Sequence, residues 1–244
     1  MSRRTAILLS AACLAVLSVI FVMNMKESGQ TQVPSGLTAE EIRIIHSSDS
    51  LLRVLTIDDS LDLKVLRAQS TDLSEAALRS EEYARLAKLM IATVSHPSQD
   101  GVGIAGPQVG LNRRVVAVQR FDRPGEPFEV YPNIRIVHAS DSLALGPEGC
   151  LSVPDRRGDV LRSQEIVIEY TSTARGSEEG RLQTVRDTVR GFTAVIFQHE
   201  IDHLDGILYI DRLCPHSNWE APGLVGQSRS ESGGPLFPNG HERP

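Results

Sequence analysis

The stretch that decides the fold of this chain is Phe197-Gln198-His199-Glu200-Ile201-Asp202-His203-Leu204, which contains an HExxH motif. In a helix, His199 and His203 lie four residues apart on one face, so both imidazoles can bind one metal ion. Glu200 lies beside them, where its carboxylate can take a proton from a water molecule that the metal polarises. An amphipathic helix with two unrelated histidines has the same spacing, so the motif alone leaves both interpretations open.

Two upstream stretches bear on this choice. Residues 101–110 contain four glycines and a proline, which excludes a helix interior and indicates a tight loop that allows close backbone approach. This loop lacks the GK[ST] and GxGxxG patterns, so phosphate binding is disfavoured. Residues 146–154 place Cys150 after a glycine in a turn-like setting, unlike the apolar surroundings of an inert buried cysteine.

The composition bounds the class of protein. The chain has 244 residues, 41% hydrophobic and 23% charged, which is typical of one soluble domain with extensions. A net charge of −6 and a pI near 5.7 argue against nucleic-acid binding, which needs a basic face. Three cysteines are too few for a disulfide framework, although a single bond between Cys150 and Cys214 stays open.

Residues 1–26 have the pattern of a membrane-targeting segment, either a signal anchor or a signal peptide. Two arginines, Arg3 and Arg4, precede an apolar run over residues 6–23, through which we expect contact with a membrane. No clean small-residue cleavage site follows, which favours an uncleaved anchor. The basic residues predict that the N-terminus stays in the cytoplasm and that the rest of the chain is outside it.

The two flanks of the central region differ in composition. Residues 27–50 begin as a polar linker and continue into a short helix, for which Thr38 and Glu41 form a capping box. Residues 214–244 are rich in serine, glycine and proline and have little periodicity, which predicts a mobile tail. The main domain is therefore expected to span residues 51–213.

Periodic patterns predict several elements within this domain. Residues 54–57 suit a strand or an extended arm, and Pro132 predicts an edge or a bend in its strand. Asp205 and Gly206 are expected to end the HExxH helix. The expected helices are residues 73–94 and 192–204; the expected strands are residues 114–118, 128–137, 165–170 and 182–190, the last two joined by a loop at 174–180.

The three distinctive stretches, GVGIAGPQ, EGCLS and HEIDH, resemble in this order the motifs of the peptide deformylase family. The resemblance covers roughly residues 54–213. It implies an α+β fold in which antiparallel β-sheets surround a central helix that carries HExxH. The chain departs mildly from the family pattern at Gly106, where alanine is usual, and at Pro132-Asn133, where the order is reversed.

The resemblance also implies a metal site. Cys150, His199 and His203 would hold one divalent ion and leave a fourth position open, as catalysis requires. In the family this ion is often Fe²⁺, with Zn²⁺, Ni²⁺ or Co²⁺ able to take its place, and a thiolate ligand suits iron and zinc alike. A purely structural metal on the same three ligands is the alternative.

The activity implied by the family is hydrolysis of the N-formyl group of N-terminal formyl-methionine in peptides, with release of formate. Glu200 would act as general base and then as general acid, and Gln108 and the backbone N–H of Leu151 would stabilise the oxyanion. The remaining residues would bind the substrate: backbone at Val102, Gly103 and Gly149, a methionine pocket lined by Phe192, Val195 and Ile196, and Arg157 further along the peptide.

Two other functions stay open at this point. One is a related metal-dependent amidase or peptidase with a different substrate, and the other is a non-catalytic peptide-binding relative. The family also complicates the location, because deformylases act on nascent chains in the cytoplasm. The chain is thus expected to be a bacterial-type protein that is membrane-anchored or exported, with the cytoplasm as the alternative.

Overall fold

The computed structural model describes residues 36–173 and 182–214. The predicted membrane segment, the loop at 174–180 and all of the predicted tail except Cys214 lie outside these residues, as does most of the linker. Within the described ranges, no helix has the length and apolar character needed to cross a bilayer.

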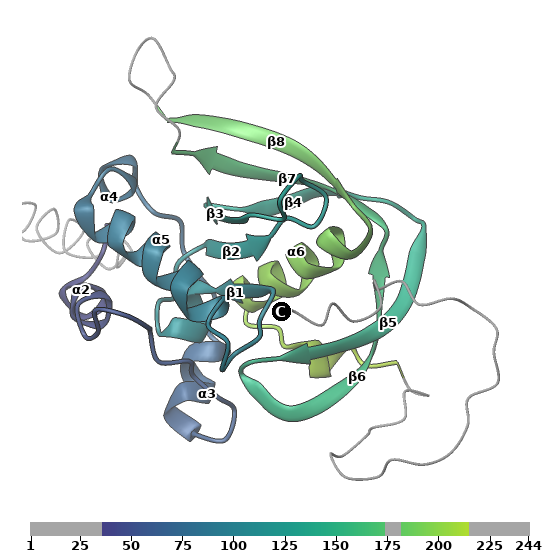
Figure 1. Cartoon of the computed structure of the whole chain (residues 1–244), viewed down its shortest axis with the longest axis horizontal. Helices are drawn as coiled ribbons and strands as arrows, with labels where there is room; N and C mark the ends of the chain where they lie inside the picture. Colours follow the sequence, from purple (N-terminus) through teal and green to yellow (C-terminus); the bar gives the residue numbers. More distant parts are fainter. Residues whose placement is uncertain (1–35, 174–181, 215–244) are drawn as a thin grey trace, which may run out of the picture. The chain divides into compact units, whose positions relative to one another are not determined.

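The helix α6, Gly191–Leu204, lies among three antiparallel sheets (Figure 1). This arrangement confirms the expected α+β fold with a central HExxH helix. The sheets have the strand orders β1-β2-β3, β4-β7-β8 and β5-β6. Their strands are β1 Gly103–Ala105, β2 Val115–Gln119, β3 Phe128–Pro132, β4 Arg135–Ala139, β5 Leu143–Cys150, β6 Val153–Ser163, β7 Glu165–Ser172 and β8 Gln183–Arg190.

Burial explains why α6 is central. Phe197 and Leu204 are fully buried and Ile201 nearly so, and most other residues of the helix are buried too. A helix that is covered on nearly all sides belongs in a core. It ends at Asp205, and Gly206 follows with φ +71°, where an added Cβ would collide with the backbone of Arg67. The predicted helix and its end are confirmed.

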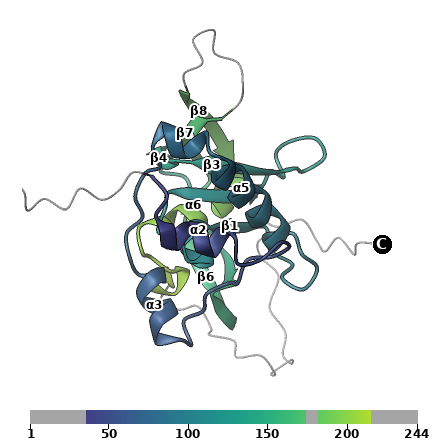
Figure 2. The same cartoon turned by 90° about the vertical axis from the view of Figure 1, so that its left-hand side faces the viewer.

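The N-terminal helices are α2 Ala39–Ile45, α3 Ser60–Leu66, α4 Glu75–Leu78 and α5 Glu81–Val94, and α2, α3 and α5 can be followed in Figure 2. The predicted capping box of α2 is confirmed. The prediction of a single helix over residues 73–94 is wrong, because the helix is interrupted between α4 and α5. Ser80 accounts for the break: its hydroxyl accepts a hydrogen bond from the backbone N–H of Tyr83 and caps α5.

The strands of the first two sheets largely follow the prediction. The expected strands at 114–118, 165–170 and 182–190 correspond to β2, β7 and β8. The single strand expected over 128–137 is wrong, since β3 and β4 belong to different sheets. Pro132 ends β3 as a bend would require, and Asn133 changes the chain direction with φ +55°.

The third sheet and an extended arm hold the motif loops. The hairpin β5–β6 was not expected, and the Leu151-Ser152 turn joins its strands. Of the two options for residues 54–57, the extended arm is correct. Its Leu55 N–H donates to the carbonyl of Gln108 at 2.8 Å, and its Ile57 N–H donates to that of Ser152 at 2.9 Å. The arm therefore connects the glycine-rich loop with the cysteine turn.

Candidate active site

Cys150, His199 and His203 come together at the end of β5 and on α6. Their possible ligand atoms all lie within 4.8 Å of one another, and Cys150 Sγ is 3.3 Å from His203 Nε2. One sulfur and two imidazole nitrogens form a donor set suited to zinc or ferrous iron. Cys150 and Cys214 are not joined to each other, so the disulfide that the sequence left open does not form.

His199 is oriented by buried charges. Its Nδ1 lies 2.8 Å from Glu148 Oε2, which leaves Nε2 to face a metal. Arg162 binds the same carboxylate through two hydrogen bonds of 2.7 and 3.0 Å. Burial alone would raise the pKa of Glu148, but His199 and Arg162 lower it to about 2. A second carboxylate, Asp202, binds Arg162 at 2.6 Å and also pairs with Arg212.

Sequence reasoning missed Glu148 and Arg162. Glu148 lies two residues before Cys150 in a stretch that the sequence indicated as a turn, so no strand pattern placed its side chain beside the ligands. Arg162 has no local signal either, because it reaches Glu148 only when β6 pairs with β5, where Arg162 lies opposite Ala144.

His203 is fully buried, and burial together with His199 lowers its pKa. The neutral ring that results is the form that can bind a metal. Within residues 36–173 and 182–214, its Nδ1 has no hydrogen-bond partner. The ring of Tyr209, the first residue of η2, Tyr209–Arg212, stacks on His199 at a centroid distance of 6.0 Å.

Glu200 is 4% exposed, and in the described part of the chain its Oε2 has no hydrogen-bond partner. Burial raises the pKa of this carboxyl to about 7. A Cβ added at Gly103 would collide with the carboxylate of Glu200, so only glycine leaves room for it there. A carboxyl that titrates near neutral pH can both accept and return a proton.

Gln108 lies on the 3-10 helix η1, Gly106–Val109, and is 1% exposed. Its Oε1 accepts the N–H of Ala105 at 2.8 Å, which fixes the orientation of the amide. Its Nε2 donates to Ser152 Oγ at 3.2 Å and lies 3.5 Å from Cys150 Sγ. Leu151 follows Cys150 directly in the turn. The structure thus brings both expected oxyanion donors close to the cysteine.

The residues expected to bind the peptide backbone lie at two free edges. Val102 precedes β1 and Gly103 begins it; in the described part of the chain, β1 is an edge strand that pairs with β2 alone. Gly149 is exposed and lies opposite the exposed Arg157 in the β5–β6 ladder. An edge strand can accept an extended peptide through main-chain hydrogen bonds.

The three helix residues expected to line the methionine pocket differ in burial. Phe192 and Val195 are half-buried, whereas Ile196 is 4% exposed and packs in the core with Phe197. Phe192 also contacts the ring of Phe121 at 5.2 Å and lies about 10 Å along the helix axis from His199, at 1.5 Å per residue. Val195 and Ile196 precede His199 by four and three residues, so both are closer to the metal ligands along the helix than Phe192 is.

Comparison with known proteins places this site in a family. Residues 51–219 match the family model described as polypeptide deformylase. Peptide deformylase 2 of Gloeobacter violaceus is 36% identical over 187 residues, covering 76% of this chain and 87% of the relative. The Met-Ala-Ser-bound class I type b peptide deformylase of Acinetobacter baumannii is 34% identical with a TM-score of 0.57, covering 68% of this chain and 100% of that one. Peptide deformylase from Thermotoga maritima is 31% identical with a TM-score of 0.56, covering 68% and 99%. The chain therefore belongs to the peptide deformylase family of hydrolases.

Proposed function

We propose that Cys150, His199 and His203 hold one divalent metal ion, next to which this chain removes the N-formyl group from formyl-methionyl peptides and releases formate. The observation that carries the proposal is the convergence of these three ligands beside Glu200, a buried carboxyl with one oxygen that has no hydrogen-bond partner among the described residues. A structural metal would not need such a carboxyl next to its ligands.

The donor set supports a catalytic ion. Three protein ligands leave a position for water or substrate, and Fe²⁺ is proposed as the native ion, with Zn²⁺, Ni²⁺ or Co²⁺ able to replace it. When bound, the ion supplies a Lewis acid that polarises the formyl carbonyl and makes water easier to deprotonate.

Glu200 moves the proton. It takes a proton from the attacking water as the bond between the water oxygen and the formyl carbon forms. It then gives this proton to the amine nitrogen as the carbon–nitrogen bond breaks, which yields formate and a free N-terminus. The raised pKa of Glu200, about 7, suits both transfers.

Gln108 and Leu151 stabilise the negative charge that develops on the formyl oxygen. The Gln108 amide is held in advance by Ala105 and Ser152, so little reorganisation is needed when charge develops. The backbone N–H of Leu151 is the second donor in the proposal.

The substrate lies as an extended strand between the edge of β1 and the end of β5. Backbone groups of Val102, Gly103 and Gly149 pair with it, and Arg157 contacts it further along. Phe192, Val195 and Ile196 line the pocket for the methionine side chain. The relative bound to Met-Ala-Ser supports a methionyl peptide as the ligand class.

An assay on the purified full-length protein, loaded with Fe²⁺ under anaerobic conditions, tests this function. Formyl-Met-Ala-Ser should yield formate, whereas acetyl-Met-Ala-Ser should yield little acetate. Absence of formate would contradict the proposal, and equal hydrolysis of both peptides would favour a broader amidase.

Membrane attachment through residues 6–23 is proposed from the basic and apolar pattern of the N-terminus alone. Protease treatment of intact bacterial cells that produce the full chain tests it. Degradation of a membrane-bound product supports an anchored domain outside the cytoplasm, and a protected product in the soluble fraction contradicts it.

A further inference from the structure

The loop that carries Gln108 is tightly folded on the segment that follows it. After η1 the chain passes through Gly110, with φ +87°, and returns over Gly106. A Cβ added at Gly106 would lie 2.6 Å from the carbonyl oxygen of Arg113 and 2.7 Å from that of Leu111. Packing this close transmits a shift of the returning segment to η1, and with it to Gln108.

Arg113 anchors the returning segment to the N-terminal helix α2. Its side chain is 3% exposed and binds Glu41 through two hydrogen bonds, Nε to Oε1 at 2.6 Å and Nη2 to Oε2 at 3.0 Å. Nη2 also donates to the carbonyl of Gly36 at 2.5 Å. A buried bidentate pair of this kind has a well-defined geometry as well as strength.

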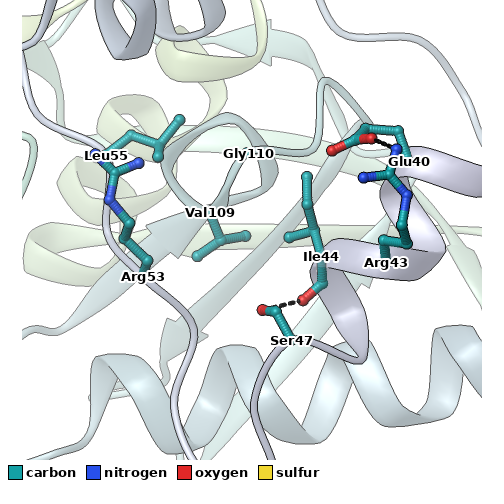
Figure 3. A pocket seen from close by; sticks show the side chains of 8 residues that line it. All are labelled: Glu40, Arg43, Ile44, Ser47, Arg53, Leu55, Val109 and Gly110. Carbon is teal, nitrogen blue, oxygen red and sulfur yellow. Dashed lines mark hydrogen bonds and ion pairs between the residues drawn. The ribbon is translucent and has the colours of Figure 1, made fainter.

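Helix α2 contacts the loop at a second point. Ile44, nearly one turn after Glu41, lies against Gly110, where an added Cβ would come within 3.3 Å of Ile44 Cδ1. Figure 3 shows Ile44 pointing from α2 toward Val109 and Gly110. A pocket opens between α2, the extended arm and η1, lined by Glu40, Arg43, Ile44, Ser47, Arg53, Leu55, Val109 and Gly110. Helix α2 therefore holds the loop at separate points and not through a continuous packed face.

Helix α2 also lies before residue 51, where the match to the family model begins. The contacts of Glu41 and Ile44 thus join a segment outside the matched region to the loop that carries a proposed catalytic side chain.

We infer that Glu41 is a positioning residue for Gln108: by holding Arg113, it fixes η1 and the direction of the Gln108 amide. This inference rests on the proposed role of Gln108 in stabilising the oxyanion. Since that donor acts mainly in the transition state, loss of the Glu41–Arg113 pair should lower kcat and leave KM nearly unchanged.

The test compares two neighbouring glutamates of α2. Glu41→Gln should lower kcat for formyl-Met-Ala-Ser roughly tenfold, because small misplacements of a catalytic group are costly. Glu40→Gln is the matched control: Glu40 has a side chain 59% exposed and pairs only with Arg43 among the partners described for it. Its kcat should stay within about twofold of the wild type, because an exposed pair contributes little. Metal content and the melting temperature are measured for each variant.

A double-mutant cycle separates positioning from general destabilisation. If Glu41 acts through Gln108, Glu41→Gln should have little further effect on kcat in a Gln108→Ala background. The inference would be overturned if Glu41→Gln lowered kcat by the same factor in the wild type and in Gln108→Ala. Equal kcat values for the Glu41 and Glu40 variants would overturn it as well. If Glu41→Gln does not fold, Glu41→Asp, which keeps the charge but shortens the reach to Arg113, takes its place in the cycle with the same expected outcomes. Formate release by the wild type is measured first and tests the activity itself. A failure of the proposed function can therefore be told apart from a failure of the inference about Glu41.

Discussion

His199 and Glu148 are joined by a 2.8 Å contact between Nδ1 and Oε2 across 51 residues of sequence. The contact assigns one ring nitrogen of His199 to a carboxylate and leaves the other for the metal. The carboxylate is itself held by Arg162, so the orientation of a metal ligand depends on an ion pair between β5 and β6. Partners that orient metal ligands in this way contribute to affinity without touching the ion.

We therefore expect Glu148→Gln to weaken metal binding by roughly 10- to 100-fold, the range typical of such partners. The neutral amide keeps the shape of the side chain but removes one of the two carboxylates that pair with the buried Arg162, leaving Asp202, so the free energy of unfolding should fall as well. Competition with a chelator measures the first effect and urea unfolding the second. Glu169→Gln, at the exposed pair with Arg186, is the control and should change neither by much.

Removing the cysteine ligand should remove the metal. Cys150→Ala is expected to lose both bound metal and turnover, because two imidazoles alone hold a divalent ion poorly. Cys214→Ala is the matched control, since this cysteine lies outside the ligand cluster, and it should keep both. Elemental analysis of the purified variants decides the matter. Full metal occupancy without Cys150 would refute its assignment as a ligand.

Glu200→Gln should keep the metal, lose turnover and change how stability depends on pH. In the metal-free folded protein the pKa of Glu200 is raised to about 7, so the folded state binds this proton more tightly than the unfolded state does. Stability is therefore lost as pH rises from about 4.5 to about 7, by roughly 3 kcal/mol.

The variant lacks this titration, so its stability relative to the wild type should rise by that amount between pH 4.5 and pH 8. Urea unfolding of both metal-free proteins at the two pH values measures the difference. A difference that does not change with pH would show that Glu200 is not perturbed by burial. Glu126→Gln, at an exposed loop position, should follow the wild type.

Gly103→Ala should impair catalysis through Glu200. The added methyl group would occupy the space of the Glu200 carboxylate, which must then move. We expect about a 100-fold loss of kcat from the misplaced base and a loss of stability of about 1–3 kcal/mol from overpacking. Gly36→Ala is the control, because an added Cβ there meets no described residue within 4 Å. Steady-state kinetics with normal activity in Gly103→Ala would contradict the close packing.

Local patterns in the sequence predict the parts of the site that depend on short spacing. The histidines of α6 are four residues apart, so their convergence follows from helix geometry. The approach of Cys150 and Gln108 to them is implied by a family resemblance and not by spacing. Arg162 was missed because its partners lie on β5 and α6, and no local pattern encodes a pairing over such sequence distances.

The errors in secondary structure have local causes. Apolar residues recur at helical spacing on both sides of Ser80, so the pattern predicts one helix over residues 73–94. The hydrogen bond by which Ser80 caps α5 ends the first helix there in spite of this pattern. The hairpin β5–β6 was not expected because Gly146, Pro147 and Gly149 are poor strand formers. In addition, Leu145 and Leu161 face solvent, so the alternating apolar residues of this hairpin lie on its exposed face and not on the face that packs on the core.

The arm at residues 54–57 limits how many residues can be removed from the N-terminus of this enzyme without disturbing the site. One of its backbone N–H groups holds the loop of Gln108, and another holds the turn after Cys150. A chain that began after Asp58 would keep every proposed ligand and catalytic side chain. It would nevertheless lose the backbone hydrogen bonds that connect the loop of Gln108 with the turn after Cys150, and with them the spacing between the oxyanion donors and the thiolate.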